Sequence, residues 1–195
     1  MTVEKSPIGW AITPLKRYAE FSGRSSRAEF WWFYLFLFII MMVLWFVLVG
    51  SLAGLGASVN ETGEPSAGAL GAMGGGVILM GLLSLAVLIP TIAVGVRRLH
   101  DTNRSGWWLG GFYLLYAVYF VMILSAMSAA MGAAMAGATE APAPDMGMMA
   151  GAGILGIVMF IYAIVLLVFY CLPGTKGDNR FGPDPYGADV EKVFA

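Results

Sequence analysis

Residues 97–108 read RRLHDTNRSGWW, and this short polar segment separates two long apolar stretches. Residues 65–96 before it contain no Lys, Arg, Asp or Glu, and the same holds for residues 105–139. Each stretch is longer than the roughly 20 apolar residues that one helix needs to cross the hydrocarbon of a bilayer. Because residues 101–103 are typical turn formers, the segment predicts a tight turn between two antiparallel transmembrane helices.

Two further stretches without charged residues, 30–60 and 146–175, lie on either side of this hairpin. Hydrophobic residues make up 59% of the 195 residues, charged residues make up only 12%, and the mean hydropathy is +0.79. A soluble domain has about 45–50% apolar residues, so the expected solvent is a bilayer. The sequence predicts an all-α integral membrane protein with four transmembrane helices in a single membrane domain, residues 1–195.

Local signals indicate where the helices begin and end. The Thr-Pro pair at 13–14 is typical of a helix N-cap, and Ser26 with Glu29 has the spacing of a capping box. Pro90 predicts a kink whose freed carbonyl needs a donor from Thr91 or a neighbouring helix. We expect a short interfacial helix at about 13–21, transmembrane helices at about 27–50, 77–98, 105–130 and 152–172, and a tail at 173–195.

The basic residues indicate the orientation in the membrane. All 11 Lys and Arg precede the first span, lie in the 97–108 turn or follow the last span. The two opposite loops, one of them the Gly- and Ala-rich residues 53–76, carry acidic residues only. The positive-inside rule therefore predicts that both termini are cytoplasmic. The mixed polar residues 1–20 do not resemble a removable signal peptide, and the net charge of -1 argues against a nucleic-acid partner.

Three motifs have compositions that are too specific for ordinary membrane flanks. They are FSGR at 21–24 with RAEFWWF at 27–33, RRLHDTNRSGWW at 97–108, and PGT at 173–175 followed by NRFGPDP at 179–185. Together they resemble the domain of unknown function 805 family over residues 18–186. The resemblance implies a small protein of the bacterial inner membrane and transfers no catalytic residue. The family often has a small residue or Gly before the basic residue of the central turn, and Asn103 tolerates the same left-handed conformation.

The predicted topology brings the three motifs to one membrane face as a candidate site. Its members are Arg24, Arg27, Glu29, Arg97, Arg98, His100, Asp101, Arg104, Trp107, Trp108, Asn179 and Arg180. One interpretation of the site is structural. Glu29 would cap a helix, and Arg27 and Arg104 would extend their charges toward the interface. Asp101 would pair with Arg98 or Arg104 to hold the turn.

The other interpretation is a binding site for anionic lipid headgroups or for an acidic partner. Guanidinium groups bind phosphate in a bidentate manner, and a basic residue beside an anionic leaflet gains about 1 kcal/mol. On this basis we expect a non-catalytic protein whose basic and aromatic surface engages lipid. The arginines expected to do so are Arg24, Arg27, Arg97, Arg98 and Arg104.

The residues indicate no catalytic, cofactor or metal site. His100 beside Asp101 lacks a nucleophile at a recognisable spacing, and one Cys and one His do not form a metal site within one chain. Methionines spaced four apart at 127–135 are interpreted as apolar packing and not as soft metal ligands. The alternative function is an oligomeric small-solute channel or transporter. Three glycine pairs have the spacing of close helix contacts in a homo-oligomer, which are Gly50 with Gly54, Gly71 with Gly75, and Gly147 with Gly151. No charged residue lies at mid-membrane, however.

Overall fold

The computed structural model describes residues 6–57, 67–137 and 145–186. These ranges contain five helices, which are α1 Pro7–Lys16, α2 Arg27–Ala57, α3 Ala67–Asp101, α4 Trp107–Met135 and α5 Met146–Cys171. Helices α2 to α5 are each long and apolar enough to cross a membrane. The described chain is therefore an all-α integral membrane protein with four transmembrane helices, as the charge-free stretches predict.

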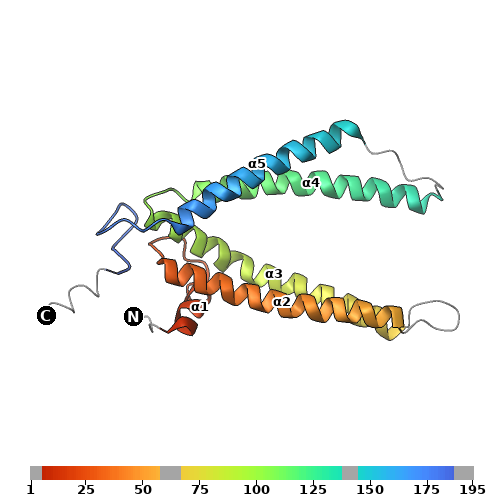
Figure 1. The fold of residues 1–195 in the computed structure, drawn as a ribbon, viewed down its shortest axis with the longest axis horizontal. Helices are drawn as coiled ribbons and strands as arrows, with labels where there is room; N and C mark the ends of the chain where they lie inside the picture. Colours follow the sequence, from red (N-terminus) through yellow and green to blue (C-terminus); the bar gives the residue numbers. More distant parts are fainter. Residues whose placement is uncertain (1–5, 58–66, 138–144, 187–195) are drawn as a thin grey trace.

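The four long helices form two hairpins that meet at one end. Helices α2 and α3 run side by side as one hairpin, and α4 and α5 form the other (Figure 1). The hairpins meet at the end that contains α1, the α3–α4 turn and the segment after α5, and they diverge toward the opposite end. Contacts between the hairpins are mainly those of α3 with α4 and α5.

Burial is concentrated where the hairpins meet. The apolar core there consists of Phe30, Phe33, Val94, Leu99, Leu109, Leu166 and Tyr170. Away from this end, large apolar side chains such as Phe46 on α2 and Phe160 on α5 are mostly exposed. Lipid tails cover such surfaces as well as protein does, so a membrane protein can hold its fold through one well-packed end.

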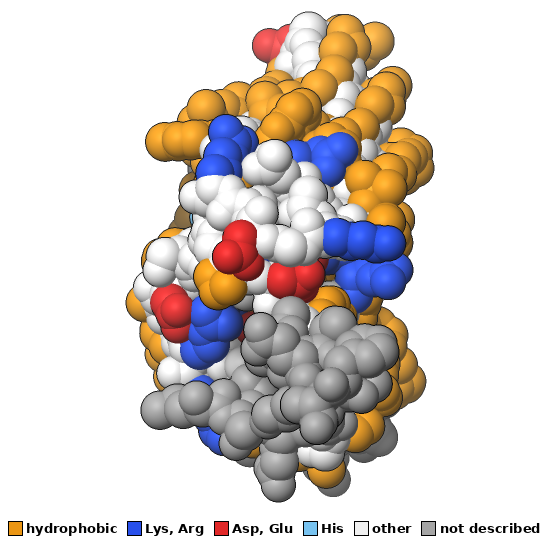
Figure 2. Space-filling model, turned by 90° about the vertical axis from the view of Figure 1, so that its left-hand side faces the viewer, with side chains coloured by type: hydrophobic (Ala, Val, Ile, Leu, Met, Phe, Trp, Pro, Cys, Tyr) orange, Lys and Arg blue, Asp and Glu red, His pale blue; other side chains and the backbone are white. Residues whose placement is uncertain are grey.

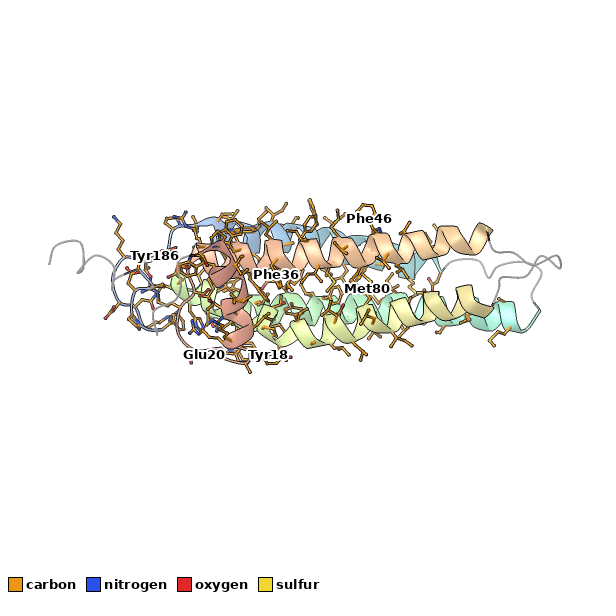
Figure 3. All side chains as sticks on the ribbon, turned by 90° about the horizontal axis from the view of Figure 1, so that it is seen from below. Tyr18, Glu20, Phe36, Phe46, Met80 and Tyr186 are labelled. Carbon is orange, nitrogen blue, oxygen red and sulfur yellow. The ribbon has the colours of Figure 1, made fainter. Side chains whose placement is uncertain are left out.

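Helix α1 lies across the ends of α2 and α3 and contacts both (Figure 3). The expected start at Thr13 is wrong, because α1 begins at Pro7 and Ser6 caps it, with the Gly9 amide donating to Ser6 Oγ at 3.0 Å. The chain contains two Ser/Thr-Pro pairs, and the earlier pair starts the helix. Thr13 lies inside α1 and donates its hydroxyl to the Gly9 carbonyl at 2.7 Å.

The region around Pro90 of α3 contacts the segment that follows α1. Pro90 has no N–H, so the carbonyl of Ala86, four residues earlier, lacks its helical donor. The Tyr18 hydroxyl donates to that carbonyl at 2.7 Å, while Thr91 bonds to Val87 instead. The donor is thus neither Thr91 nor a residue of a neighbouring helix, the two sources expected from the sequence. It is Tyr18 in the segment after α1, and this bond attaches that segment to α3.

The α2–α3 hairpin is longer than expected at its diverging end. Helix α2 continues to Ala57 where an end near 50 was expected, and α3 begins at Ala67 where a start near 77 was expected. The interpretation of most of 53–76 as a loop is therefore wrong. Each Gly costs a helix about 1 kcal/mol, but extending a helix that has already formed adds one backbone hydrogen bond for each residue fixed. The acidic residues at 61 and 64 lie outside the described residues.

The α4–α5 hairpin also extends beyond the expected bounds. Helix α4 begins at Trp107, two residues after the expected start, with the Trp107 amide 3.3 Å from Ser105 Oγ, and it continues to Met135. Helix α5 begins at Met146 and not near 152, because Asp145 Oδ1 accepts hydrogen bonds from the first amides of the helix. An Asp N-cap is a signal that the sequence does contain. The expected loop residue Glu140 lies outside the described residues.

Candidate functional site

The three sequence motifs come together at the end where the hairpins meet, which we call the cap, residues 17–30, 94–108 and 170–186. Its centre contains five buried charged side chains, which are Arg24, Glu29, Arg97, Arg98 and Asp101. Each is at most 6% exposed. An unpaired buried charge costs several kcal/mol, so the partners of these groups determine what the cap does.

Arg97 joins α3 to the N-terminal part of the chain. Its Nη2 donates to Glu29 Oε1 on α2 at 2.9 Å, and its Nη1 donates to the carbonyl of Glu20 at 3.0 Å. The Arg17 carbonyl is a further acceptor at 3.3 Å. Glu29 therefore acts mainly as an ion-pair partner. The expected capping box is confirmed from one side only, with the Glu29 amide donating to Ser26 Oγ at 3.1 Å.

Arg98 faces the other hairpin. Its guanidinium pairs with Asp101 one turn later on α3 and donates to the carbonyls of Tyr170, at 3.1 Å, and Leu172. These carbonyls belong to the last turn of α5, where backbone acceptors have no helical partner and where the helix dipole favours a cation. Arg98 therefore fixes the end of α5 to the end of α3.

Arg24 connects the segment before α2 to the segment after α5. Its Nε donates to Asp101 Oδ1 at 3.0 Å, and its Nη1 donates to the Gly177 carbonyl at 2.6 Å. Asp101 thus lies between two guanidinium groups from different parts of the chain. The expected Asp101–Arg98 pair is confirmed, whereas Arg104, the other expected partner, contacts Asp101 in no interaction among the described residues.

The segment after α5 packs closely against Asp101. The amide and the hydroxyl of Thr175 donate to the Asp101 backbone carbonyl at 2.8 and 2.9 Å. A Cβ at Gly174 would lie only 2.2 Å from Asp101 Oδ2. Each residue of the Pro-Gly-Thr motif thus has a separate role. The Pro follows the end of α5, the Gly leaves room for the Asp101 side chain, and the Thr provides two donors to the Asp101 carbonyl.

His100 and the α3–α4 turn attach to the last motif. The His100 ring stacks on Phe181 with centroids 3.9 Å apart, and its Nδ1 lies 3.1 Å from the Gly23 carbonyl. Asn179 donates to the His100 carbonyl at 2.9 Å. Asn103 adopts φ 58°, which confirms the expected left-handed turn, and its carbonyl accepts from Arg180 at 3.2 Å. His100 and Asp101 thus contact different partners and form no imidazole–carboxylate pair.

Other predicted site residues lie at the border of the cap. The Arg104 guanidinium lies 4.0 Å from the centroid of the Phe169 ring, where a cation–π contact holds it. Trp108 packs against the same ring, and its carbonyl accepts from the Tyr162 hydroxyl at 2.7 Å. Trp107 is 83% exposed. Figure 2 views the molecule from the cap end, and basic side chains there are spread around the face instead of forming one patch.

Arg27 differs from the arginines of the cap centre, because it is exposed and forms no ion pair or side-chain hydrogen bond with a described residue. It lies in a groove of about 520 Å³ between the start of α2 and the end of α5, which we call the Arg27 groove. Its lining residues are Arg27, Ala28, Trp31, Trp32, Leu35 and Cys171. A cation above an apolar and aromatic surface is thus available to an external anion.

A family model described as "Protein of unknown function (DUF805)" matches residues 18–183, which include nearly all of the cap and all four long helices. This chain belongs to the DUF805 family. It is 29% identical to "Inner membrane protein YhaH" of Escherichia coli K12 over 91% of this chain and 97% of that protein. It is 28% identical to "Inner membrane protein YhaI" of the same organism over 90% and 94%. No solved structure matches the chain.

This DUF805 chain keeps most predicted site residues together but divides them into two kinds. Arg24, Glu29, Arg97, Arg98 and Asp101 form the buried centre, with His100 and Asn179 beside it. Arg27, Arg104, Trp107, Trp108 and Arg180 lie at the border. Two residues of the site were not predicted from the sequence. Thr175 donates its amide and hydroxyl to the Asp101 carbonyl, and Tyr170 accepts from Arg98 through its backbone carbonyl. The Pro-Gly-Thr motif signals Thr175, whereas no local pattern distinguishes Tyr170 from other interfacial tyrosines.

Proposed function

We propose that this chain is a non-catalytic inner-membrane protein that binds the headgroups of anionic phospholipids in the Arg27 groove, on the cytoplasmic side. The observation that carries the proposal is the contrast between Arg27 and the three buried arginines. Arg24, Arg97 and Arg98 already have carboxylate and carbonyl partners inside the protein. The guanidinium of Arg27 has none among the described residues and is open to a phosphate.

The surroundings of Arg27 suit a phospholipid headgroup. A guanidinium binds phosphate through two parallel hydrogen bonds. Trp31 and Trp32 lie one turn further along α2, about 40% exposed, and Trp is enriched at the depth of lipid headgroups. The proposal keeps the lipid partner that the sequence indicates but narrows the five arginines expected to bind it to one principal residue.

The non-catalytic part of the proposal is supported by the chemistry of the cap centre. Both buried carboxylates, Glu29 and Asp101, are held by guanidinium groups, which leaves neither poised as a general base. The His100 ring is stacked on Phe181 and directs Nδ1 toward a backbone carbonyl. Glu29, Asp101 and His100 therefore bind other segments of the chain.

Native mass spectrometry of the full chain tests the headgroup site. The protein would be released from vesicles that contain equal amounts of phosphatidylglycerol and phosphatidylcholine. We expect preferential retention of phosphatidylglycerol, reduced about fivefold in Arg27→Gln, which is the factor for about 1 kcal/mol per basic residue at an anionic leaflet. Arg180→Gln is the matched control, because Arg180 is also exposed but lies on the segment after α5. Equal retention by wild type and Arg27→Gln would contradict the proposal.

The orientation is a separate part of the proposal and rests on the one-sided distribution of Lys and Arg. A reporter that is active only outside the cytoplasm should be silent when fused after residue 195. The same reporter should be active when inserted between residues 61 and 64. Activity at residue 195 would reverse the assigned orientation and would place the Arg27 groove at the outer leaflet.

The second candidate function is an oligomeric small-solute channel or transporter. The observation that favours it is the space beside Gly71 and Gly75 on α3, where a Cβ would meet no atom of the described residues within 4 Å. A second copy of the chain could approach closely at these positions. Flux of small solutes through liposomes that contain an oligomeric protein would support this function, and a monomer without flux would exclude it.

A further inference from the structure

We infer that a phospholipid bound at Arg27 places one of its acyl chains in an aromatic cavity between the two hairpins, an inference that rests on the headgroup site proposed above. The cavity has a volume of about 310 Å³, and we call it the hairpin cavity. Helix α2 contributes Phe30, Trp31 and Tyr34. Helices α4 and α5 contribute Leu109, Phe112, Tyr113, Ala163, Leu166, Leu167 and Tyr170.

The hairpin cavity adjoins the Arg27 groove, because one residue lines both. Trp31 lines both, so its ring separates the space beside Arg27 from the space between the hairpins. The Trp31 ring packs against Phe30 in an edge contact with centroids 5.2 Å apart, which holds it in this position. Because Trp31 is 39% exposed, a lipid with its phosphate at Arg27 would pass an acyl chain over Trp31 to reach the cavity.

The cavity lies at the depth that the acyl esters of such a lipid would occupy. Phe30 follows Arg27 by nearly one helical turn, which is about 5 Å along α2. The Phe30 ring packs on Tyr170 with centroids 4.4 Å apart, so Tyr170 lies at this same level. In a phospholipid the glycerol joins the phosphate to the ester carbonyls, which are hydrogen-bond acceptors just below the headgroup.

Tyr170 lines the inner wall of the cavity with its ring. Its hydroxyl is buried beside Gly95 of α3, which is not a lining residue, so the wall at this level presents apolar and aromatic atoms. The aromatic walls would cover the beginning of the acyl chain.

The position of the cavity also lets a chain enter from the bilayer. The hairpins diverge from the cap toward the opposite end of the molecule (Figure 1). The cavity residues are on the first turns of α2 and α4 and on the last turns of α5, where this divergence begins. An acyl chain longer than the cavity can thus continue along the exposed apolar faces of the helices.

Photo-crosslinking of the full chain in nanodiscs tests the inference directly. The probe is phosphatidylglycerol with a diazirine in one acyl chain near the ester, and the labelled residues are identified by mass spectrometry. We expect labelling at Tyr113, which lines the cavity, to exceed by severalfold labelling at its neighbour Leu114, which is 67% exposed at the same depth. Equal labelling of the two residues would mean that the chain only surrounds the protein, and would overturn the inference.

Filling the cavity provides a second arm of the test. Ala163→Phe places a ring in the cavity from α5, and Ala117→Phe adds the same ring to an exposed position of α4 as the control. Labelling of Tyr113 should fall to the level of Leu114 in Ala163→Phe and remain unchanged in Ala117→Phe. If Ala163→Phe proves unstable, Ala163→Leu fills part of the same space and should still lower Tyr113 labelling, whereas Ala117→Leu should leave it unchanged.

The outcomes separate this inference from the headgroup proposal. Arg27-dependent retention of phosphatidylglycerol together with unchanged Tyr113 labelling in both Ala163→Phe and Ala163→Leu would refute the seated chain and leave the headgroup site intact. Absence of a lipid preference in the wild type would refute the headgroup site itself. Labelling of Tyr113 that depends on both Arg27 and Ala163 would establish both.

Discussion

The centre and the border of the cap use the same residue type for two purposes. In the centre, three arginines are buried and bound to carboxylates and backbone carbonyls from distant segments. At the border, Arg27 is exposed beside two Trp residues and has no partner among the described residues. A count of positive charges does not distinguish these roles. The buried arginines hold the hairpins together, whereas Arg27 at the border has no protein partner among the described residues, which is why we propose it as the lipid-binding residue.

The strongest test of the centre is the removal of the residue that two arginines share. Asp101→Ala leaves Arg24 and Arg98 buried without their carboxylate. Breaking a buried ion pair costs about 3–5 kcal/mol, and we expect a loss of this size in the free energy of unfolding, measured in detergent by titration with SDS. Asp178→Ala, at an exposed position of the same cap, is the control. A loss below 1 kcal/mol for Asp101→Ala, roughly the size of a surface pair, would show that the centre is not structural.

A smaller effect is expected for the other buried carboxylate. Glu29→Gln keeps the shape of the side chain but removes the charge that faces Arg97 at 2.9 Å. Because Gln can still accept a hydrogen bond, we expect a loss of about 2 kcal/mol, within the range for hydrogen bonds to charged groups. The same SDS titration measures it. No change in the unfolding curve would mean that Arg97 is held by backbone carbonyls alone.

The packing of the last motif gives a third test. Gly174→Ala introduces a Cβ that would lie 2.2 Å from Asp101 Oδ2, so the segment after α5 must shift. Overpacking of this kind costs about 1–3 kcal/mol, and the thermal midpoint in detergent should fall accordingly. Gly153→Ala is the matched control, since a Cβ there meets nothing within 4 Å. Equal midpoints for both variants would contradict the close packing on Asp101.

The smallest effect is expected for the exposed pair of Arg17 and Glu20. The hydrogen bonds from Arg17 hold the pKa of Glu20 below its usual range. The pair therefore stabilises the fold above the ordinary carboxyl pKa, and this contribution is lost as the pH falls. Solvent screening limits its size, so Glu20→Gln should cost under about 0.5 kcal/mol at pH 7. A loss as large as that of Glu29→Gln would remove the distinction between buried and exposed pairs.

The sequence predicts the parts of this protein that depend on local rules. The four charge-free stretches are enough to predict four transmembrane helices, because a bilayer excludes charge over a fixed thickness. Asn103 is enough to predict the left-handed turn. Helix ends are harder to predict where two signals compete, as in the Ser6 and Thr13 pairs, or where an established helix continues through poor helix formers.

The division of the arginines could not be predicted, because their partners are distant in the chain. Arg24 and Asp101 are 77 residues apart, and Arg98 binds carbonyls of the last turn of α5. Every backbone has carbonyls, so no sequence pattern marks which ones will accept. The hairpin cavity could not be predicted for the same reason, since its walls come from three helices that only the fold brings together.

The most direct test of the central claim is the reactivity of each arginine toward phenylglyoxal, measured by mass spectrometry on the full chain in nanodiscs. In phosphatidylcholine we predict that Arg27 is modified while Arg24, Arg97 and Arg98 are protected. In phosphatidylglycerol we predict that Arg27 also becomes protected. Modification of Arg97 and Arg98 as fast as Arg27, or an Arg27 that reacts equally in both lipids, would contradict the account.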